Sequence, residues 1–151
     1  MKNILKTVIA GFLITTMTST TVFATGIGYI DYKKIQDNYS LAKTAAKLID
    51  NKSLELQQYL VDKEKQYKAL DTPLKKQNFE EKTTKEFKAK QEAFAKLKIQ
   101  KETEIYDKIQ EATNQVLIEQ KLDAIFDYRV IFVGGTDVTN LVLNKLNNVK
   151  K

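Results

Sequence analysis

The feature that most constrains the fold of this chain is a long stretch without glycine. No glycine occurs between Tyr29 and Val133, and Pro73 is the only proline among the 151 residues. Glycine and proline are the residues that most often end helices. We therefore predict a helical region over residues 34–121 that is interrupted at Asp71-Thr72-Pro73. The simplest arrangement is an antiparallel hairpin of two helices, and the alternative is a single bent helix.

Apolar residues in this region recur with the spacing of a coiled coil. Two series with a period of seven are Ile35, Ala42, Ile49, Leu56, Lys63 and Leu70, and Tyr39, Ala46, Ser53, Leu60, Tyr67 and Leu74. Only Ser53 and Lys63 interrupt them, and such spacing is typical of a coiled-coil seam on a continuous helix. In the second half, one face carries Phe87, Phe94, Leu97, Ile105, Ile109, Ala112 and Val116. A polar interruption falls there around Lys98 and Lys101.

Extended segments are predicted only at the two ends of the chain. Ile27–Ile30 has the character of a strand that ends at Asp31. The apolar runs 124–126 and 130–133 predict two more strands, arranged as a short hairpin. Gly134-Gly135 predicts a tight turn, and the last residues predict a short helix. If the long helices fold back on each other, these strands meet at the base of the helical arm.

The expected fold is mainly α with a small β body that carries a long antiparallel coiled-coil helical hairpin. The body comprises residues 25–33 and 122–151, and the arm comprises residues 34–121. The body has fewer than the roughly 40 residues that usually fold without disulfides, metals or oligomerisation. We do not expect the arm to complete its core, because the arm points away. Oligomerisation through the body is therefore predicted, with these contact residues: Ile27, Tyr29, Ile125, Val130 and Phe132.

The first 24 residues have the pattern of a secretory signal peptide. Lys2 and Lys6 precede a short apolar run at residues 8–14, and Val22-Phe23-Ala24 is close to the A-x-A cleavage pattern. We predict cleavage after Ala24 and a single domain over residues 25–151. An uncleaved N-terminal anchor is the alternative.

Lysines are concentrated in the distal part of the predicted arm. Between Asp62 and Lys101 there are twelve lysines and seven acidic residues. Such a surface attracts anionic partners such as acidic polypeptides or lipid headgroups, although a charged helix face is also an ordinary solvated surface. The candidate contact lysines are Lys75, Lys76, Lys82 and Lys85.

Aromatic residues on the arm are candidates for contact with an apolar ligand. They are Tyr59, Tyr67, Phe79, Phe87 and Phe94. The alternative is that they pack in the seam of the hairpin, which is the better interpretation for Tyr67 and Phe94. Phe79 lies near the tip, where the seam is least complete, and is therefore the stronger candidate for ligand contact.

No set of residues predicts catalysis. The chain contains no Cys and no His, which removes most zinc sites and the usual nucleophile–base pairs. Asp31 is interpreted as a helix cap, and no G-K-[ST] follows Gly134-Gly135 to form a phosphate loop. We predict neither enzyme activity nor a bound metal or cofactor.

The two ends of the mature sequence resemble the Skp/OmpH family of periplasmic chaperones. The resemblance is carried by the strand that ends at Asp31, by the segment "YKKIQDNYSLAKTAAKLI" and by "GGTDVTNLVLNKLN" with Asp137-Val138-Thr139. It implies a homotrimer whose arms surround a cavity that holds unfolded outer-membrane proteins without nucleotide or metal. Contact with anionic lipid or lipopolysaccharide through the lysines is a further expectation.

Two other functions compete with the expected role of a holdase, a chaperone that holds unfolded proteins in the periplasm without nucleotide. A structural coiled-coil spacer or adaptor of the cell envelope is the alternative, although a spacer does not need an oligomerising body with an incomplete arm seam. A nucleic-acid binder is disfavoured, because the chain has a signal peptide and its distal lysines only moderately outnumber the acidic residues.

Overall fold

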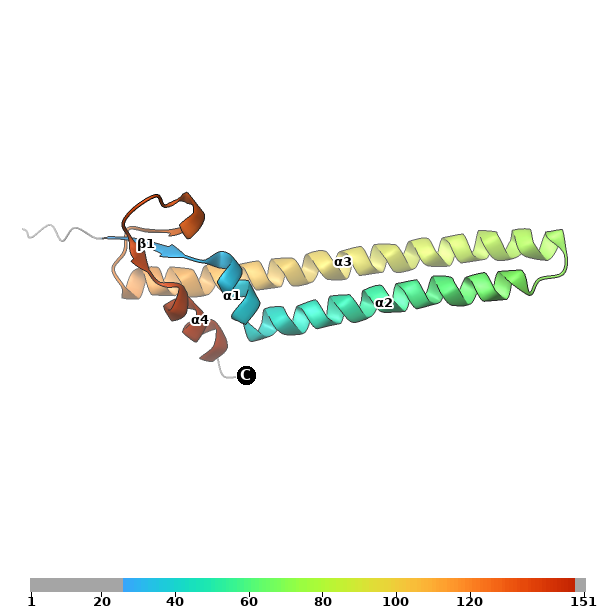
Figure 1. Ribbon diagram of the computed structural model, residues 1–151, viewed down its shortest axis with the longest axis horizontal. Coiled ribbons are helices and arrows are strands. Elements are labelled where there is room, and N and C mark those ends of the chain that lie inside the picture. Colours follow the sequence, from blue (N-terminus) through green and yellow to red (C-terminus); the bar gives the residue numbers. More distant parts are fainter. Residues whose placement is uncertain (1–25, 149–151) are drawn as a thin grey trace, which may run out of the picture.

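The molecule consists of a long two-helix arm and a small body at one end (Figure 1). The structure is a computed structural model that describes residues 26–148, so the predicted signal peptide lies outside the described residues. The elements are β1 (Ile27–Ile30), α1 (Tyr32–Asn38), α2 (Ser40–Lys68), α3 (Pro73–Glu119), β2 (Ala124–Asp127), the 3-10 turn η1 (Tyr128–Val130), β3 (Thr136–Asp137) and α4 (Thr139–Asn148). The prediction of a mainly helical chain with a small β body is confirmed.

The arm forms because α2 and α3 lie side by side and the chain reverses direction between them (Figure 1). The reversal lies at the predicted Asp71-Thr72-Pro73 turn. The Thr72 hydroxyl oxygen accepts a hydrogen bond from the Lys75 backbone N–H at 3.4 Å, and Pro73 occupies the first turn of α3. A proline is well tolerated there, because the backbone N–H that it lacks would have no partner within the helix.

The helix predicted to run without interruption from Lys34 is broken at Tyr39. Helix α1 ends at Asn38 and α2 begins at Ser40, because Tyr39 has an extended backbone with φ −77° and ψ 123°. The Asn147 side chain of α4 stabilises the break. Its amide oxygen accepts a hydrogen bond from the Ser40 N–H at 3.0 Å, and its amide nitrogen donates one to the Asn38 carbonyl at 3.2 Å.

The body contains a parallel three-stranded sheet in the order β2-β1-β3. In the register, Ile27 lies opposite Ala124, and Gly28 lies opposite both Ile125 and Thr136. Two strands joined by a crossover as long as the arm can pair in parallel, whereas a short hairpin would pair them antiparallel. The two ends of the chain therefore meet at the base of the arm, as predicted.

The predicted hairpin of strands 124–126 and 130–133 is wrong, because residues 131–133 form no strand and Val130 belongs to η1. The Asp127 carboxylate ends β2 by accepting a hydrogen bond from the Arg129 N–H at 3.0 Å, and the Arg129 guanidinium binds the same carboxylate at 2.8 Å. This local cap turns the chain away from the sheet. Gly134 and Gly135 have positive φ, of 85° and 89°, and lead into β3. The chain bends just before them, at residues 132–133, and the tight turn predicted at the two glycines is not formed.

The main core lies where the body meets the root of the arm. Its buried residues are Ile30, Ile35, Tyr39, Ala42, Ile109, Ala112, Val116, Val138, Val142, Leu143 and Leu146. The expectation that the arm does not contribute to this core is wrong, because α2 supplies Ala42 and α3 supplies Ile109, Ala112 and Val116. The arm points away only beyond its first turns, and its root acts as part of the body.

A hydrogen-bonded cluster joins the two ends of the sequence above this core. The Asp31 carboxylate caps α1 by accepting from the Lys34 N–H at 2.9 Å, which fits its predicted role. The Asp31 N–H donates to the buried Thr139 hydroxyl at 2.9 Å, and Asp137 accepts from the Thr139 N–H at 2.9 Å. Asp137 and Thr139 therefore help to fix the fold of the body.

Candidate functional site

The seam between α2 and α3 is only partly closed. Ile49, Ser53, Leu56, Lys63 and Tyr67 are half-buried, in agreement with the heptad pattern. Three positions of the pattern, Ala46, Leu60 and Leu74, are instead exposed. The places of Ala46 and Leu60 in the seam are taken by Ala45 and Tyr59. A helix with 3.6 residues per turn drifts relative to a strict seven-residue repeat, so the residue that faces the partner helix shifts along the chain.

The five candidate aromatic residues all lie in the hairpin and are half-buried. The rings of Tyr59 and Phe87 are stacked with centroids 6.3 Å apart and an interplanar angle of 6°. Tyr67 and Phe79 are tilted by 46° at the same separation. Phe79 is therefore packed against the opposite helix despite its place near the tip. Part of each ring remains accessible, so a role in ligand contact stays a prediction.

A polar cluster interrupts the seam halfway along the distal arm. The Tyr59 hydroxyl donates a hydrogen bond to the Glu86 carboxylate at 2.7 Å, and Lys63 pairs with the same carboxylate at 3.4 Å. The Lys63 ammonium also lies 5.2 Å from the centre of the Tyr59 ring. Burial between the helices, together with the hydrogen bond to Glu86, raises the pKa of Tyr59 to about 12. The Tyr59 hydrogen bond and the nearby Lys63 lower the pKa of Glu86.

The four candidate lysines differ in how freely their ammonium groups could bind an anionic ligand. Lys75 pairs with Asp71 at 2.9 Å, and Lys82 lies 3.9 Å from Glu86. Lys76 is half-buried, with its ammonium 5.5 Å from the centre of the Tyr67 ring. Lys85 is exposed. Exposed ion pairs contribute little free energy, so an anionic ligand could compete for the paired lysines.

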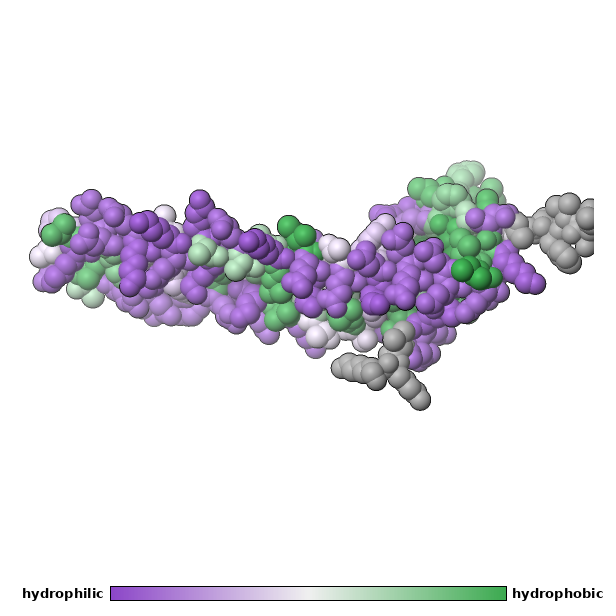
Figure 2. All heavy atoms as spheres, turned by 180° about the vertical axis from the view of Figure 1, so that it is seen from behind, coloured by the Kyte–Doolittle hydropathy of each residue, from purple (hydrophilic) through white to green (hydrophobic). Residues whose placement is uncertain are grey.

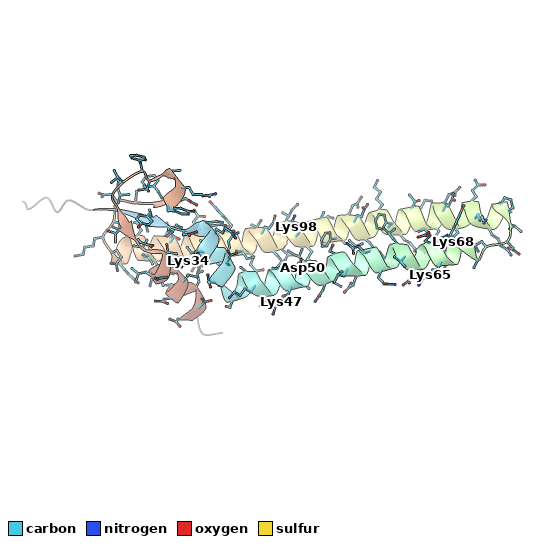
Figure 3. The ribbon with its side chains drawn as sticks, in the orientation of Figure 1. Lys34, Lys47, Asp50, Lys65, Lys68 and Lys98 are labelled. Carbon is cyan, nitrogen blue, oxygen red and sulfur yellow. The ribbon has the colours of Figure 1, made fainter. Side chains whose placement is uncertain are left out.

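Charged side chains project along the whole arm. Figure 3 shows them on both long helices, with Lys47, Asp50, Lys65 and Lys68 labelled on α2 and Lys98 labelled on α3. Figure 2 shows the result on one face, where the arm is mostly hydrophilic with scattered hydrophobic groups. The arm surface therefore combines a basic field with small apolar contacts.

An apolar surface covers the loop that follows β2. Figure 2 shows hydrophobic residues gathered over the body in this region. We define the body patch by its exposed apolar and aromatic residues, namely Ile27, Phe126, Tyr128, Val130, Phe132 and Val133. Phe132 is fully exposed, and Val133 is 86% exposed.

The body patch contains three of the five predicted oligomerisation residues. Ile27, Val130 and Phe132 are exposed, whereas Tyr29 is half-buried. Ile125 packs partly against the core of its own chain. Sequence reasoning missed Phe126, Tyr128 and Val133. The alternation of apolar and charged residues in the segment "FDYRV" was a signal that could have identified Phe126 and Tyr128.

The described residues offer neither a metal centre nor a membrane-spanning helix. Over residues 26–148, no group of three or more His, Cys, Asp or Glu side chains is placed to hold a metal ion. Within the same part of the chain, none of the helices is both long and apolar enough to cross a bilayer.

Comparison with known proteins identifies the family. The family model described as outer membrane protein (OmpH-like) matches residues 26–146. No curated protein matches the sequence. Among solved structures, the chain is similar to a protein from Caulobacter crescentus CB15 assigned as an outer membrane chaperone (OmpH-like). The two sequences are 12% identical, the match covers 82% of this chain and 84% of that chain, and the TM-score is 0.45. Because the family model matches most of the sequence, the chain belongs to the OmpH-like family.

Proposed function

We propose that the chain is an ATP-independent holdase chaperone that binds unfolded outer-membrane proteins in the periplasm. The proposal is supported by the surface of the arm. The seam of the arm is only half-buried, and its aromatic rings remain partly accessible. Between Asp62 and Lys101 the arm also carries more lysines than acidic residues. Export to the periplasm rests on the signal-peptide pattern, with cleavage after Ala24. The mature domain is residues 25–151.

Capture is proposed to proceed in two physical steps. The basic field of the distal arm attracts acidic segments of an unfolded chain over a range of about 8 Å at physiological ionic strength. Many weak apolar contacts with the scattered hydrophobic groups of the arm then retain it. Neither step requires nucleotide or metal. Lys75, Lys76, Lys82 and Lys85 are the proposed charged contacts, and the same lysines are the proposed contacts for anionic lipid or lipopolysaccharide.

The proposed assembly is a homotrimer formed through the body patch. Fully exposed Phe132 and 86% exposed Val133 are unfavourable in water, and a contiguous apolar patch on a small body is typical of a protein–protein contact. The number three comes from the resemblance to Skp/OmpH chaperones. In such an assembly, three arms with coiled-coil seams would extend from the joined bodies and surround the bound polypeptide.

The test is suppression of aggregation without nucleotide. A urea-denatured outer-membrane protein is diluted into buffer with and without the mature protein, and light scattering is recorded. We expect less scattering with the wild-type protein, and a weaker effect at high salt that does not vanish, because salt screens charges but not apolar contacts. No suppression at several-fold molar excess would instead favour the envelope spacer or adaptor.

Two charge-reversal variants distinguish the effect of the distal lysines on capture from the effect of the protein's net charge. Replacing Lys75, Lys76, Lys82 and Lys85 with Glu is expected to weaken capture. The matched control replaces four exposed lysines closer to the body with Glu, namely Lys43, Lys47, Lys108 and Lys121. Equal loss in both variants would mean that capture depends on net charge and not on the distal surface.

A further inference from the structure

A cavity of about 280 Å³ opens between α2 and α3 midway along the arm. Its apolar wall is formed by Leu56, Phe94 and Leu97, and Ala93 lies at its side. Lys52 and Lys90 contribute the polar part of the lining, together with Glu55. The cavity thus combines an apolar interior with charged side chains from both helices.

Small side chains lie at and near this space. Ser53, one of the two polar interruptions of the heptad pattern, is half-buried and follows the cavity residue Lys52 in the sequence, but it does not line the cavity. Ala93 is the smallest lining side chain on α3. Further along the arm, the stacked rings of Tyr59 and Phe87 fill the seam. The cavity is open to solvent, so its apolar side chains face water, and an apolar occupant would remove them from it.

The two lysines that line the cavity differ in whether they form an ion pair. Lys52 is neutralised by Glu55, with 2.6 Å between ammonium and carboxylate. Lys90 forms no ion pair within the described part of the chain, and its ammonium lies 5.1 Å from the centre of the Tyr59 ring. One positive charge therefore remains available at the α3 side of an apolar cavity. Charge complementarity favours an occupant that carries a carboxylate next to an apolar group.

We propose that this cavity is an anchor subsite for an aromatic side chain that lies two residues from an acidic residue in an extended, unfolded polypeptide. Residues i and i+2 of an extended chain point to the same side and are separated by about 6.6 Å. The aromatic ring would enter between Leu56, Phe94 and Leu97, and the carboxylate would pair with Lys90. This inference rests on the proposed holdase function and specifies which segments of an unfolded client the arm prefers.

The absence of tryptophan from the chain allows a direct binding test. The probe is the peptide acetyl-Trp-Ser-Asp-amide, whose fluorescence is recorded during titration with the full mature protein. Acetyl-Trp-Ser-Lys-amide is the charge control. We expect the acidic peptide to bind about twofold to fivefold more tightly than the basic one, since a solvent-accessible ion pair contributes at most about 1 kcal/mol.

Two matched pairs of variants locate the site. Ala93→Leu fills the cavity and is expected to weaken binding of the acidic peptide by about tenfold or more, as expected from the lost burial of an aromatic ring. Ala95→Leu adds the same side chain two residues further on, at a position that is equally exposed but does not line the cavity, and should leave binding unchanged. Lys90→Gln should abolish the preference for the acidic peptide, whereas Lys88→Gln, at another exposed position, should preserve it.

The outcomes separate the subsite from the holdase function. Equal peptide binding by Ala93→Leu and Ala95→Leu overturns the subsite, whatever the aggregation assay shows. A preference that survives in Lys90→Gln overturns the assigned role of Lys90. Binding of laurate, measured by isothermal titration calorimetry, together with no binding of the peptide would overturn the proposal in favour of a fatty acid. If the peptide binds as expected but the wild-type protein fails to suppress aggregation, the holdase function fails and the cavity remains a binding site.

Discussion

At the scale of single residues, the Asp31–Thr139 hydrogen bond shows most clearly how the body is held together. It joins residues separated by 108 positions in the sequence, at 2.9 Å, and the Thr139 side chain is fully buried. The sequence indicated the cap at Asp31, because a carboxylate after a strand and before a helix has that local role. It did not indicate the partner Thr139, because a contact over that distance depends on the path of the whole arm.

Replacing Thr139 with Val should destabilise the fold by about 1–3 kcal/mol, because the Asp31 N–H loses its acceptor while the shape of the side chain is retained. Urea denaturation followed by circular dichroism measures the change. Thr44→Val is the matched control, since the exposed Thr44 hydroxyl bonds only to the Ser40 carbonyl of its own helix. Equal losses in the two variants would contradict a special role for Thr139.

Gly28 is required for close packing in the sheet. A Cβ atom at this buried position would lie 2.7 Å from the Leu122 side chain and 3.2 Å from that of Ile125. Gly28→Ala should therefore cost about 1–3 kcal/mol through overpacking. At Gly26 the nearest atom would be 3.8 Å away, so Gly26→Ala should have little effect on the midpoint of thermal unfolding. A Gly28→Ala variant as stable as Gly26→Ala would show that the contact relaxes freely.

At the scale of elements, the break between α1 and α2 was not predictable from sequence. No glycine or proline lies near Tyr39, and the seven-residue pattern continues through it. The break depends on two tertiary features: burial of the Tyr39 ring in the core and the two hydrogen bonds from Asn147. The helical hairpin itself was predictable, because Pro73 and the long regular patterns on either side are local features.

Replacing Asn147 with Ala should loosen the start of α2. The Ser40 N–H would lose its acceptor, so its amide hydrogen should exchange faster with solvent, because protection reports the local opening of such bonds. Hydrogen exchange measured by NMR gives the rates residue by residue. Asn148→Ala, at the next exposed position, is the control and should leave the Ser40 rate unchanged.

The polar cluster of the arm predicts a dependence of stability on pH. The lowered pKa of Glu86 stabilises the fold above the ordinary glutamate pKa, and this contribution is lost as pH falls through the lowered value. The Tyr59 pKa of about 12 stabilises the fold below about pH 10, and this contribution is lost as pH rises from about 10 to 12. Tyr59→Phe should therefore differ most from wild type in urea denaturation near neutral pH. A difference of constant size up to about pH 12 would exclude the Tyr59–Glu86 hydrogen bond as its cause.

At the scale of the whole molecule, the sequence predicted that both ends meet at the base of the arm but not how they pair. The apolar run at residues 130–133 resembles a strand by composition, yet Val130 and Phe132 are exposed in the loop after β2. A run of apolar residues predicts that these side chains are buried. It does not show whether the surface that buries them belongs to the same chain or to another copy. The pairing of β3 could not be predicted either, because Thr136-Asp137 is too short to show periodicity.

The proposed assembly makes the exposure of Phe132 testable. In a single chain this side chain is fully exposed, so Phe132→Asp should leave the fold of each copy intact. In a trimer formed through the body patch, the same change would place a carboxylate in an apolar contact, where an uncompensated charge costs several kcal/mol. We therefore expect native mass spectrometry to show three copies for the wild-type protein and single, folded copies for Phe132→Asp.

Leu74→Asp introduces the same charge at an exposed leucine near the tip of the arm and should remain trimeric. A trimeric Phe132→Asp variant would place the interface elsewhere, and loss of its helical circular dichroism would mean that Phe132 supports the fold of the single chain.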